Sequence, residues 1–454
     1  MLAVSITLIY ILLSIAVGVI SGRGGNKNTR EFFVSQGNLP FTMLIPLLFG
    51  ELVAGAGTVG NAAGAYTEGV SAVWGVWGQA LGCVIFVVFA SRFFYQAGQK
   101  GAISVAEAFE SRFDKKVRTA VSLVVLMAFT IVYAMQPAAI VGILEPLLGV
   151  SRWGLMVGCT ALFVFLALFG LKGIARMNIV HSILIFSVMA VIGAGTLQSA
   201  GGLENVVNTV DASCFRLFLP DFKTASGEIL GAAFAMVSAA TVVNSCYSAR
   251  SLRDARKGIG SVALIIMIFA LFPVIIGISA KVVFPDANAN SIIYIAAEQL
   301  SPVLSTLAAV AICASVLSTA PALLLTLSAT VTRDIFGLIK PEADDREQMV
   351  FSRVSIVVIA FGAMFLSMNM QSILKEWLAS FQIRAIVGIV LIISIYWKRV
   401  TASAAFWAIL VGGLLATVWH YTGNPLGWQP FWVSCVSGVG ILCGATILSP
   451  HASE

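Results

Sequence analysis

The sequence predicts an all-α protein that crosses a membrane about 13 times. Of its 454 residues, 59% are hydrophobic and only 11% are charged, whereas soluble domains carry roughly 25% charged residues. Apolar runs of about 18 residues or more, the length that crosses a bilayer as a helix, recur along the chain. Lysine and arginine gather in alternate connections between these runs. We therefore expect a polytopic membrane protein.

The apolar runs predict thirteen spans, and the first is expected to be a retained helix. It lacks the basic leader of a signal peptide and runs into Ser21 and Gly22 without a clear small-residue cleavage pattern. The predicted spans lie near residues 2–20, 40–67, 70–95, 119–147, 153–171, 177–199, 228–249, 259–284, 302–332, 351–369, 376–397, 403–421 and 430–448.

The distribution of positive charge predicts the orientation of these spans. Counting from the first connection, every second connection is rich in lysine and arginine, and together these connections hold 21 of the 27 such residues. The opposite side holds only Arg152, Arg216, Lys223, Lys281 and Lys375, and Arg384 lies inside a span. Because positive residues accumulate on the cytoplasmic side, the N-terminus is expected outside and the C-terminus inside. The net charge of +6 follows from this asymmetry and does not call for a nucleic-acid partner.

The second predicted span carries an isolated carboxylate among helix-weakening glycines. Glu51 follows Gly50 in an otherwise apolar run that continues through Gly55, Gly57 and Gly60. A helix break inside a bilayer frees backbone carbonyls, so such a segment normally lines a site or a water-filled path. In secondary transporters the freed carbonyls often hold a coupling ion.

The ninth predicted span places three hydroxyl groups on one helix face. Ser315, Ser318 and Thr319 stand at i, i+3 and i+4, with Pro321 just beyond. Two interpretations are open at this point. The hydroxyls could bond to the backbone of their own helix, or they could supply oxygen ligands for a cation.

Several segments in one order resemble a known transporter family. The strongest is Ala-Ser-Val-Leu-Ser-Thr-Ala at 314–320, followed by Thr-Arg-Asp-Ile-Phe at 332–336. The other matching segments are 29–39, 60–69, 101–113, 170–175, 249–257 and 396–399. Together they resemble the sodium/solute symporter family, which includes proline, sialic acid, pantothenate and glucose carriers.

The resemblance implies a leucine-transporter-like core of two inverted repeats of five helices each. Spans two to six and seven to eleven would form the repeats. Residues 1–454 would then be a single transporter domain. Its parts would be a peripheral first helix and loop (1–38), the first repeat (39–199), the second repeat (200–400) and two peripheral C-terminal helices (401–454).

The resemblance also implies a sodium site between the two repeats. Its ligands would be the backbone carbonyls of Gly50, Val53 and Ser315 with the hydroxyls of Ser318 and Thr319, an all-oxygen set of the kind that hard cations prefer. Where some relatives have an aspartate that serves a second sodium site, this chain has Asn178. One sodium ion is therefore the expectation from the resemblance.

Five polar residues inside the spans are candidates for binding the solute: Glu51, Gln79, Gln136, Asn244 and Arg384. Glu51 and Arg384 are the acid and base placed well inside spans, and two interpretations are open. They could form a buried salt bridge with each other, or Arg384 could bind a solute carboxylate while Glu51 receives an amine, a hydroxyl or a proton. The amides would orient the solute, since polar groups deep in apolar runs need partners.

The expected function is sodium-coupled symport of a small organic solute, an organic anion or an amino-acid-like molecule, by alternating access in the inner (plasma) membrane. The expected partners are sodium, the solute and membrane lipid, with no nucleic acid and no obligatory protein partner. A proton-coupled carrier that uses Glu51 is the alternative within transport. A membrane sensor on a transporter fold is disfavoured because the chain ends at Glu454, just after the last span. A membrane enzyme is disfavoured because the sequence has no His-Glu-x-x-His motif or other cluster of metal ligands.

Overall fold

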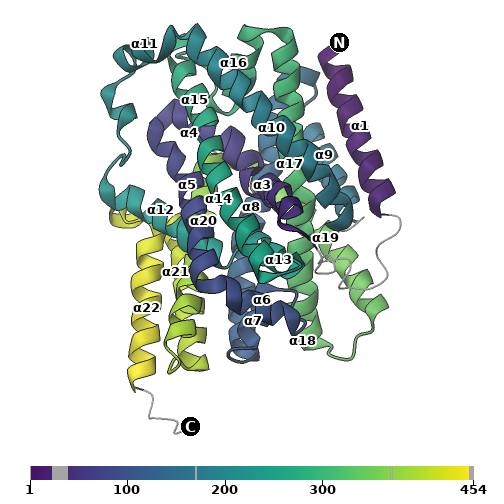
Figure 1. The fold of residues 1–454 in the computed structure, drawn as a ribbon, viewed down its shortest axis with the longest axis vertical. Coiled ribbons are helices and arrows are strands. Elements are labelled where there is room, and N and C mark those ends of the chain that lie inside the picture. The colour runs from purple at the N-terminus through teal and green to yellow at the C-terminus, as the bar shows by residue number, and fades with distance from the viewer. Residues whose placement is uncertain (1, 23–38, 169–170, 369, 371, 449–454) are drawn as a thin grey trace.

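The computed structural model describes residues 2–22, 39–168, 171–368, 370 and 372–448, and these residues form a helical bundle (Figure 1). Within these ranges the only β contact is an isolated parallel bridge between Leu39 and Ala249. The helices are α1 (Leu2–Gly22), α3 (Phe41–Gly55), α4 (Asn61–Glu68), α5 (Trp74–Ile85), α6 (Ser91–Gln99), α7 (Val105–Glu110), α8 (Lys115–Leu148), α9 (Arg152–Ala167), α10 (Leu171–Ser199), α11 (Gly202–Thr209), α12 (Phe222–Val237), α13 (Ala240–Ser248), α14 (Leu252–Phe269), α15 (Leu271–Val283), α16 (Ile292–Leu300), α17 (Pro302–Ala329), α18 (Gly337–Ile339), α19 (Asp345–Met368), α20 (Ile373–Tyr396), α21 (Ala402–Tyr421) and α22 (Pro430–Leu448). Three π-helical segments, η1 (Ala56–Gly60), η3 (Phe86–Ala90) and η6 (Thr330–Phe336), interrupt or extend them.

The described residues confirm a polytopic helical membrane protein. Ten helical segments are long and apolar enough to cross a bilayer, and a bent pair, Phe41–Val53 with Ala56–Glu68, would make an eleventh span. Two shorter apolar helices, Ser5–Ala16 and Arg152–Ala167, fall on the predicted first and fifth spans. The total of thirteen spans, the inverted repeat and the domain boundaries remain predictions.

Several helices begin earlier than hydropathy predicts, because capping side chains set where they start. The Asp114 carboxylate accepts a hydrogen bond from the backbone N–H of Val117 (2.9 Å), so α8 begins at Lys115 rather than near 119. Asp221 caps α12 in the same way, accepting from the N–H of Thr224 (2.7 Å). This bond holds the pKa of the Asp221 carboxyl below its usual value.

The most buried helix is α17, which runs through the middle of the bundle. In its most apolar window, 94% of the residues are buried inside the protein. It packs against α3, α8 and α10, while α12 packs between α5 and α20. The helices α1 and α22 lie on opposite sides of the bundle (Figure 1). A buried polar group on α17 therefore faces other helices rather than lipid.

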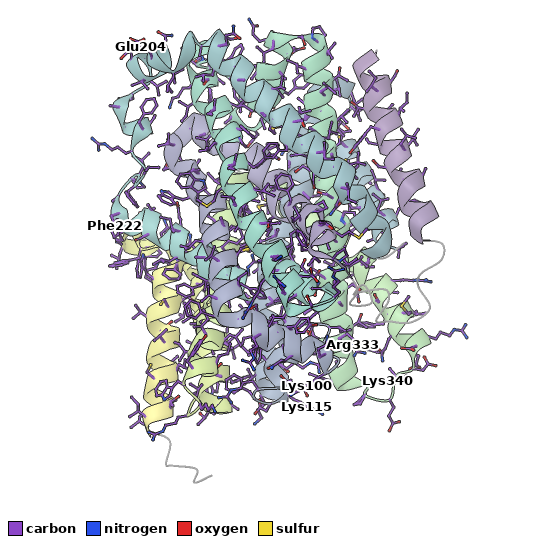
Figure 2. All side chains as sticks on the ribbon, in the orientation of Figure 1. Lys100, Lys115, Glu204, Phe222, Arg333 and Lys340 are labelled. Carbon is purple, nitrogen blue, oxygen red and sulfur yellow. The ribbon has the colours of Figure 1, made fainter. Side chains whose placement is uncertain are left out.

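Basic residues from two of the predicted cytoplasmic connections lie at one end of the bundle (Figure 2). Figure 2 shows Lys100, Lys115, Arg333 and Lys340 at this end and Glu204 at the other. We call the end marked by these four residues the basic end. It is also the end at which α22 finishes (Figure 1).

Close packing of α12 against α20 depends on Gly388. A Cβ atom at this position would clash with the Phe234 carbonyl oxygen. We expect Gly388→Ala to destabilise the protein by about 1–3 kcal/mol, because the two backbones must separate. Gly260→Ala is the matched control, since a Cβ there meets nothing within 4 Å. Thermal unfolding in detergent measures both, and equal melting temperatures for the two variants would contradict this account of the packing.

Candidate functional site

The predicted broken helix is present at the centre of the bundle. The segments Phe41–Val53 and Ala56–Glu68 are bent by 59° relative to each other, and the π-helical turn η1 follows α3. Side chains satisfy backbone groups freed by the break. Gln136 on α8 accepts a hydrogen bond from the Gly55 N–H (3.4 Å), and the Thr58 hydroxyl donates to the Gly55 carbonyl (3.2 Å). The break is thus held from two sides, as freed backbone groups inside a membrane require.

Four oxygen atoms meet where the broken helix touches α17. The hydroxyls of Ser318 and Thr319 lie 2.9 and 3.0 Å from the Gly50 carbonyl oxygen. They also lie 2.7 and 3.0 Å from the Ser315 carbonyl oxygen, and 3.3 Å from each other. All three α17 residues are at most 2% exposed. We call these four atoms, from Gly50, Ser315, Ser318 and Thr319, the oxygen cluster.

The oxygen cluster has more acceptors than protons. Each hydroxyl carries one proton, yet each lies within hydrogen-bond distance of two carbonyl oxygens. Two protons cannot fill all of these contacts, so lone pairs face one another inside a buried site. Such a surplus of lone pairs suits a hard cation, which prefers oxygen ligands.

The resemblance also singled out Val53 and Asn178. Val53 is fully buried on α3, one turn beyond Gly50, and among the described contacts its carbonyl makes no hydrogen bond to the cluster hydroxyls. Asn178 lies beside Gly50: a Cβ atom built on Gly50 would be 3.1 Å from the Asn178 amide nitrogen. Both amide atoms of Asn178 are buried without a hydrogen-bond partner.

Arg384 is buried on α20 with no acidic partner among the described ion pairs. Its guanidinium carbon lies 4.5 Å from the centre of the Phe129 ring and 5.1 Å from that of Phe381. Its residue exposure is 2%, and Nε and Nη1 are buried without hydrogen-bond partners. A buried guanidinium that lies against two aromatic rings, with Nε and Nη1 unpartnered, lacks the anion that its planar fork suits.

Glu51 is not paired with Arg384, so the interpretation of a salt bridge between them is wrong for this structure. The Glu51 carboxyl faces Thr241 on α13, and both residues line one cavity. This cavity, which we call the Glu51 cavity, also contacts Asn244 and extends along α17 to Asp334. Arg384 does not line this cavity.

The five predicted solute residues therefore do not form one constellation. Glu51 and Asn244 share the Glu51 cavity, Gln136 supports the helix break, and Arg384 lies apart from them. Gln79 is buried on α5 with its amide nitrogen unpartnered.

Sequence reasoning missed three polar residues near the break. Thr58 lies 3.5 Å from the Ser315 hydroxyl, Asn61 is fully buried with both amide atoms unpartnered, and Thr241 contacts Glu51. Thr58 and Asn61 stand among the glycines that predicted the break, so their position could have indicated them. Thr241 depends on the contact between α3 and α13, which a single sequence does not reveal.

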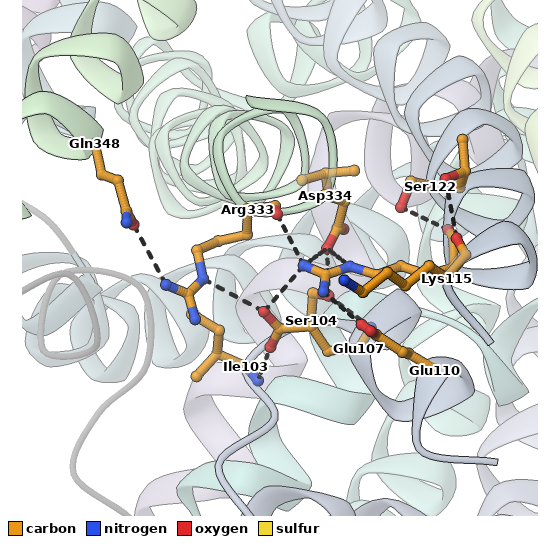
Figure 3. A network of polar contacts seen from close by, with 12 residues as sticks. Ile103, Ser104, Glu107, Glu110, Lys115, Ser122, Arg333, Asp334 and Gln348 are labelled. Atoms are coloured by element: carbon orange, nitrogen blue, oxygen red, sulfur yellow. Dashed lines mark hydrogen bonds and ion pairs between the residues drawn. The ribbon is translucent and has the colours of Figure 1, made fainter. Parts of the chain in front are cut away.

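Arg118 forms ion pairs with three carboxylates, those of Glu107, Glu110 and Asp334. Figure 3 shows these three residues together with Arg333. The Arg118 guanidinium contacts Asp334 at 2.8 Å and Glu107 at 3.3 Å, and it also bonds Glu110. It donates to the Arg333 carbonyl (2.8 Å) as well. The network joins α7 and α8 to η6, which are segments from the two predicted repeats.

Loss of Arg118 is expected to destabilise the protein. Arg118→Ala leaves the nearly buried Asp334 and two further carboxylates without their shared cation, and we expect a loss of about 3 kcal/mol. Arg250→Ala is the control, because Arg250 is 59% exposed in an i,i+4 pair with Asp254, and such pairs contribute well under about 1 kcal/mol. Melting temperatures that fall equally in both variants would rule out a special role for the network.

With this geometry in view, comparison with known proteins identifies the family. The sodium:solute symporter family matches residues 32–412. The chain belongs to the sodium:solute symporter family. This symporter is 22% identical over 441 residues to the sodium/pantothenate symporter of Escherichia coli, covering 90% of this chain and 88% of that one. It is 24% identical over 378 residues to the osmoregulated proline transporter OpuE of Bacillus subtilis, covering 79% and 76% of the two chains.

Solved structures show the same fold. A sodium-coupled sialic acid symporter in a substrate-bound outward-open state superposes with a TM-score of 0.82 at 18% identity, over 98% of this chain and 97% of the other. MhsT in complex with L-phenylalanine gives a TM-score of 0.59 at 13% identity, over 89% and 98% of the two chains. The symporter is thus an integral membrane transporter rather than an enzyme.

Proposed function

We propose that this symporter couples the inward movement of sodium to the uptake of a small organic solute that carries a carboxylate, by alternating access. The observation that carries the proposal is the oxygen cluster, which joins the broken helix to α17 through Gly50, Ser318 and Thr319. Family membership supports sodium as the coupling ion. The proposed sodium ligands are the carbonyls of Gly50, Val53 and Ser315 and the hydroxyls of Ser318 and Thr319.

Sodium bound at this cluster would tie α3 to α17. Since the two helices belong to different predicted repeats, the ion would favour the arrangement in which the repeats are correctly spaced for the solute. By thermodynamic linkage, the solute must then raise sodium affinity by the same factor. When sodium dissociates on the cytoplasmic side, the solute would lose affinity and dissociate as well.

Arg384 supports a carboxylate on the solute. An unpaired buried guanidinium is unfavourable in a membrane unless an anion joins it, and a planar carboxylate matches its paired N–H groups. Gln79, whose buried amide nitrogen is unpartnered, would orient the rest of the solute, while Gln136 holds the helix break. An organic anion and an amino-acid-like zwitterion both carry such a carboxylate, so both are candidate solutes.

The basic end is proposed to face the cytoplasm, with the N-terminus outside, in the inner (plasma) membrane. The positions of Lys100, Lys115, Arg333 and Lys340 at one end support this orientation (Figure 2).

Uptake into proteoliposomes tests the proposed function. A panel of carboxylated solutes and their neutral amides is offered under an inward sodium gradient, a potassium gradient of equal size, or a pH gradient. We expect sodium to drive uptake of at least one carboxylate and none of the amides. Uptake driven by the pH gradient alone, and abolished by Glu51→Gln, would replace this proposal by proton coupling.

A further inference from the structure

Basic residues stand at the start of α14. The segment Leu252–Val283 is long and apolar enough to cross a bilayer, yet Arg253, Arg256 and Lys257 lie in its first two turns. All three are exposed. Positive residues at the end of a span normally lie where the helix leaves the hydrocarbon. The start of α14 therefore marks a surface of the membrane.

This surface is on the same side of the membrane as the basic end of the bundle. The preceding helix, α13, packs against α6, which ends just before Lys100. The Tyr247 hydroxyl on α13 donates to the Ser104 carbonyl (3.1 Å), and the Tyr95 hydroxyl on α6 donates to the Arg250 carbonyl (3.5 Å). These bonds hold the segment that leads into α14 beside helices of the basic end.

An open pocket lies between the start of α14 and the start of α3. The N–H of Leu39 donates to the Ser248 carbonyl (2.9 Å) and the N–H of Arg250 donates to the Leu39 carbonyl (3.1 Å), so backbone bonds fix the two chain segments against each other. The pocket, which we call the α14 pocket, has a volume of about 490 Å³ and is lined by Phe41, Arg250, Ser251, Arg253, Asp254 and Lys257.

The α14 pocket has an excess of positive charge. Three cations and one carboxylate line it. The Asp254 carboxylate already accepts hydrogen bonds from Arg250 (2.7 Å) and Ser251 (2.8 Å). Neither Arg253 nor Lys257 has a partner among the described ion pairs. Two positive charges thus face a pocket that has room for an anion.

The same face of α14 becomes apolar further into the membrane. Leu264 and Ile268 continue the helical spacing of Arg253 and Lys257, so the four residues follow one helix face. Leu264 is 62% exposed and Ile268 is 46% exposed. From Lys257 to Ile268 the helix rises about 16 Å at 1.5 Å per residue, close to half of the roughly 30 Å hydrocarbon core. A phospholipid has the same order of groups, with a phosphate at the surface and acyl chains that cross one leaflet.

We propose that the α14 pocket binds one anionic phospholipid from the leaflet at the basic end. Its phosphate lies between Arg253 and Lys257, and an acyl chain follows the apolar face beyond them. Basic pockets between helices at a membrane surface recognise lipid headgroups in this way. Because Phe41 is the first residue of α3, the bound lipid joins the membrane to the half of the broken helix that carries Gly50. The proposal goes beyond the proposed function and needs neither sodium nor solute.

Native mass spectrometry of the purified full chain in detergent tests the proposal. The probes are phosphatidylglycerol and phosphatidylcholine with the same acyl chains, each titrated separately. We expect wild type to bind one phosphatidylglycerol more tightly than phosphatidylcholine. Arg253→Gln with Lys257→Gln should lower the affinity for phosphatidylglycerol about 30-fold and leave the affinity for phosphatidylcholine unchanged.

Arg256→Gln with Lys100→Gln is the matched control. It removes the same charge from exposed positions on the same side of the membrane, but Arg256 donates to the Ser91 hydroxyl (2.9 Å) and neither residue lines the α14 pocket. This variant should bind phosphatidylglycerol as wild type does, and so should Lys257→Arg, which keeps the charge. Melting temperatures show that each variant is folded.

Three results would overturn the proposal. Equal affinity of wild type for the two lipids would show that the pocket does not select an anionic headgroup. An equal loss of affinity in the two double variants would show that charge at this end acts without a specific site. Displacement of the lipid by an equal concentration of inorganic phosphate would assign the pocket to a soluble anion instead. Since neither sodium nor solute is present, none of these results bears on the oxygen cluster.

Discussion

Replacing Ser318 and Thr319 by alanine together is expected to abolish sodium-stimulated uptake while the protein remains folded. The variant removes two of the four oxygens of the cluster, the two that join α17 to the Gly50 carbonyl. If each ion contact contributes about 1.5 kcal/mol, as hydrogen bonds to charged groups do, sodium affinity falls about 100-fold or more. The measurement is initial uptake as a function of external sodium.

Ser328→Ala is the control for this variant. Ser328 lies on the same helix and its hydroxyl is buried and bonded to Ser352, but it is not in the cluster. Its loss should change stability without changing the sodium dependence of uptake. If the double variant keeps the wild-type sodium dependence, the hydroxyls serve only their own helix, which is the simpler interpretation of the sequence pattern.

Replacing Arg384 by glutamine is expected to remove solute binding and to leave the protein as stable as wild type or more stable. The solute loses its carboxylate partner, and we expect at least about a 100-fold loss of affinity. Stability does not fall, because the arginine has no ion-pair partner among the described residues and its burial is unfavourable. Solute binding and melting temperature, measured on the same preparation, give the two readouts.

Arg384→Lys separates charge from shape. Lysine keeps the positive charge but lacks the paired planar N–H groups, so we expect intermediate affinity for a carboxylate. A large loss of stability in Arg384→Gln, with solute affinity unchanged, would instead make Arg384 a structural residue.

The sequence predicted the membrane fold well because its main signals are local. The bilayer imposes both the length of the apolar runs and the placement of basic residues in alternate connections, so both can be read from short stretches of sequence. The glycines between Gly50 and Gly60 predicted the helix break that the structure contains. Some predicted helices began too late in the sequence, because hydropathy does not detect capping residues such as Asp114, whose side chain sets the first residue of α8.

The candidate site was predicted less completely because it depends on contacts between distant segments. Resemblance to the family brought Gly50 together with Ser318 and Thr319, and the structure places their oxygens in contact. Glu51 and Arg384 were singled out because they are charged residues inside apolar spans. That position indicates that each residue needs a partner, but it does not show which residue the partner is. Glu51 faces α13 through Thr241 and Arg384 faces Phe129, and neither contact has a signature in one sequence.

The most direct test of sodium binding at the oxygen cluster is thermal stabilisation of the purified protein by sodium against potassium at equal ionic strength. We expect the wild-type melting temperature to rise with sodium and not with potassium, since an ion that binds only the folded state stabilises it. The rise should shrink in the Ser318→Ala, Thr319→Ala variant and persist in Ser328→Ala. A wild-type protein that melts at the same temperature in both salts would contradict the central claim that this cluster binds sodium.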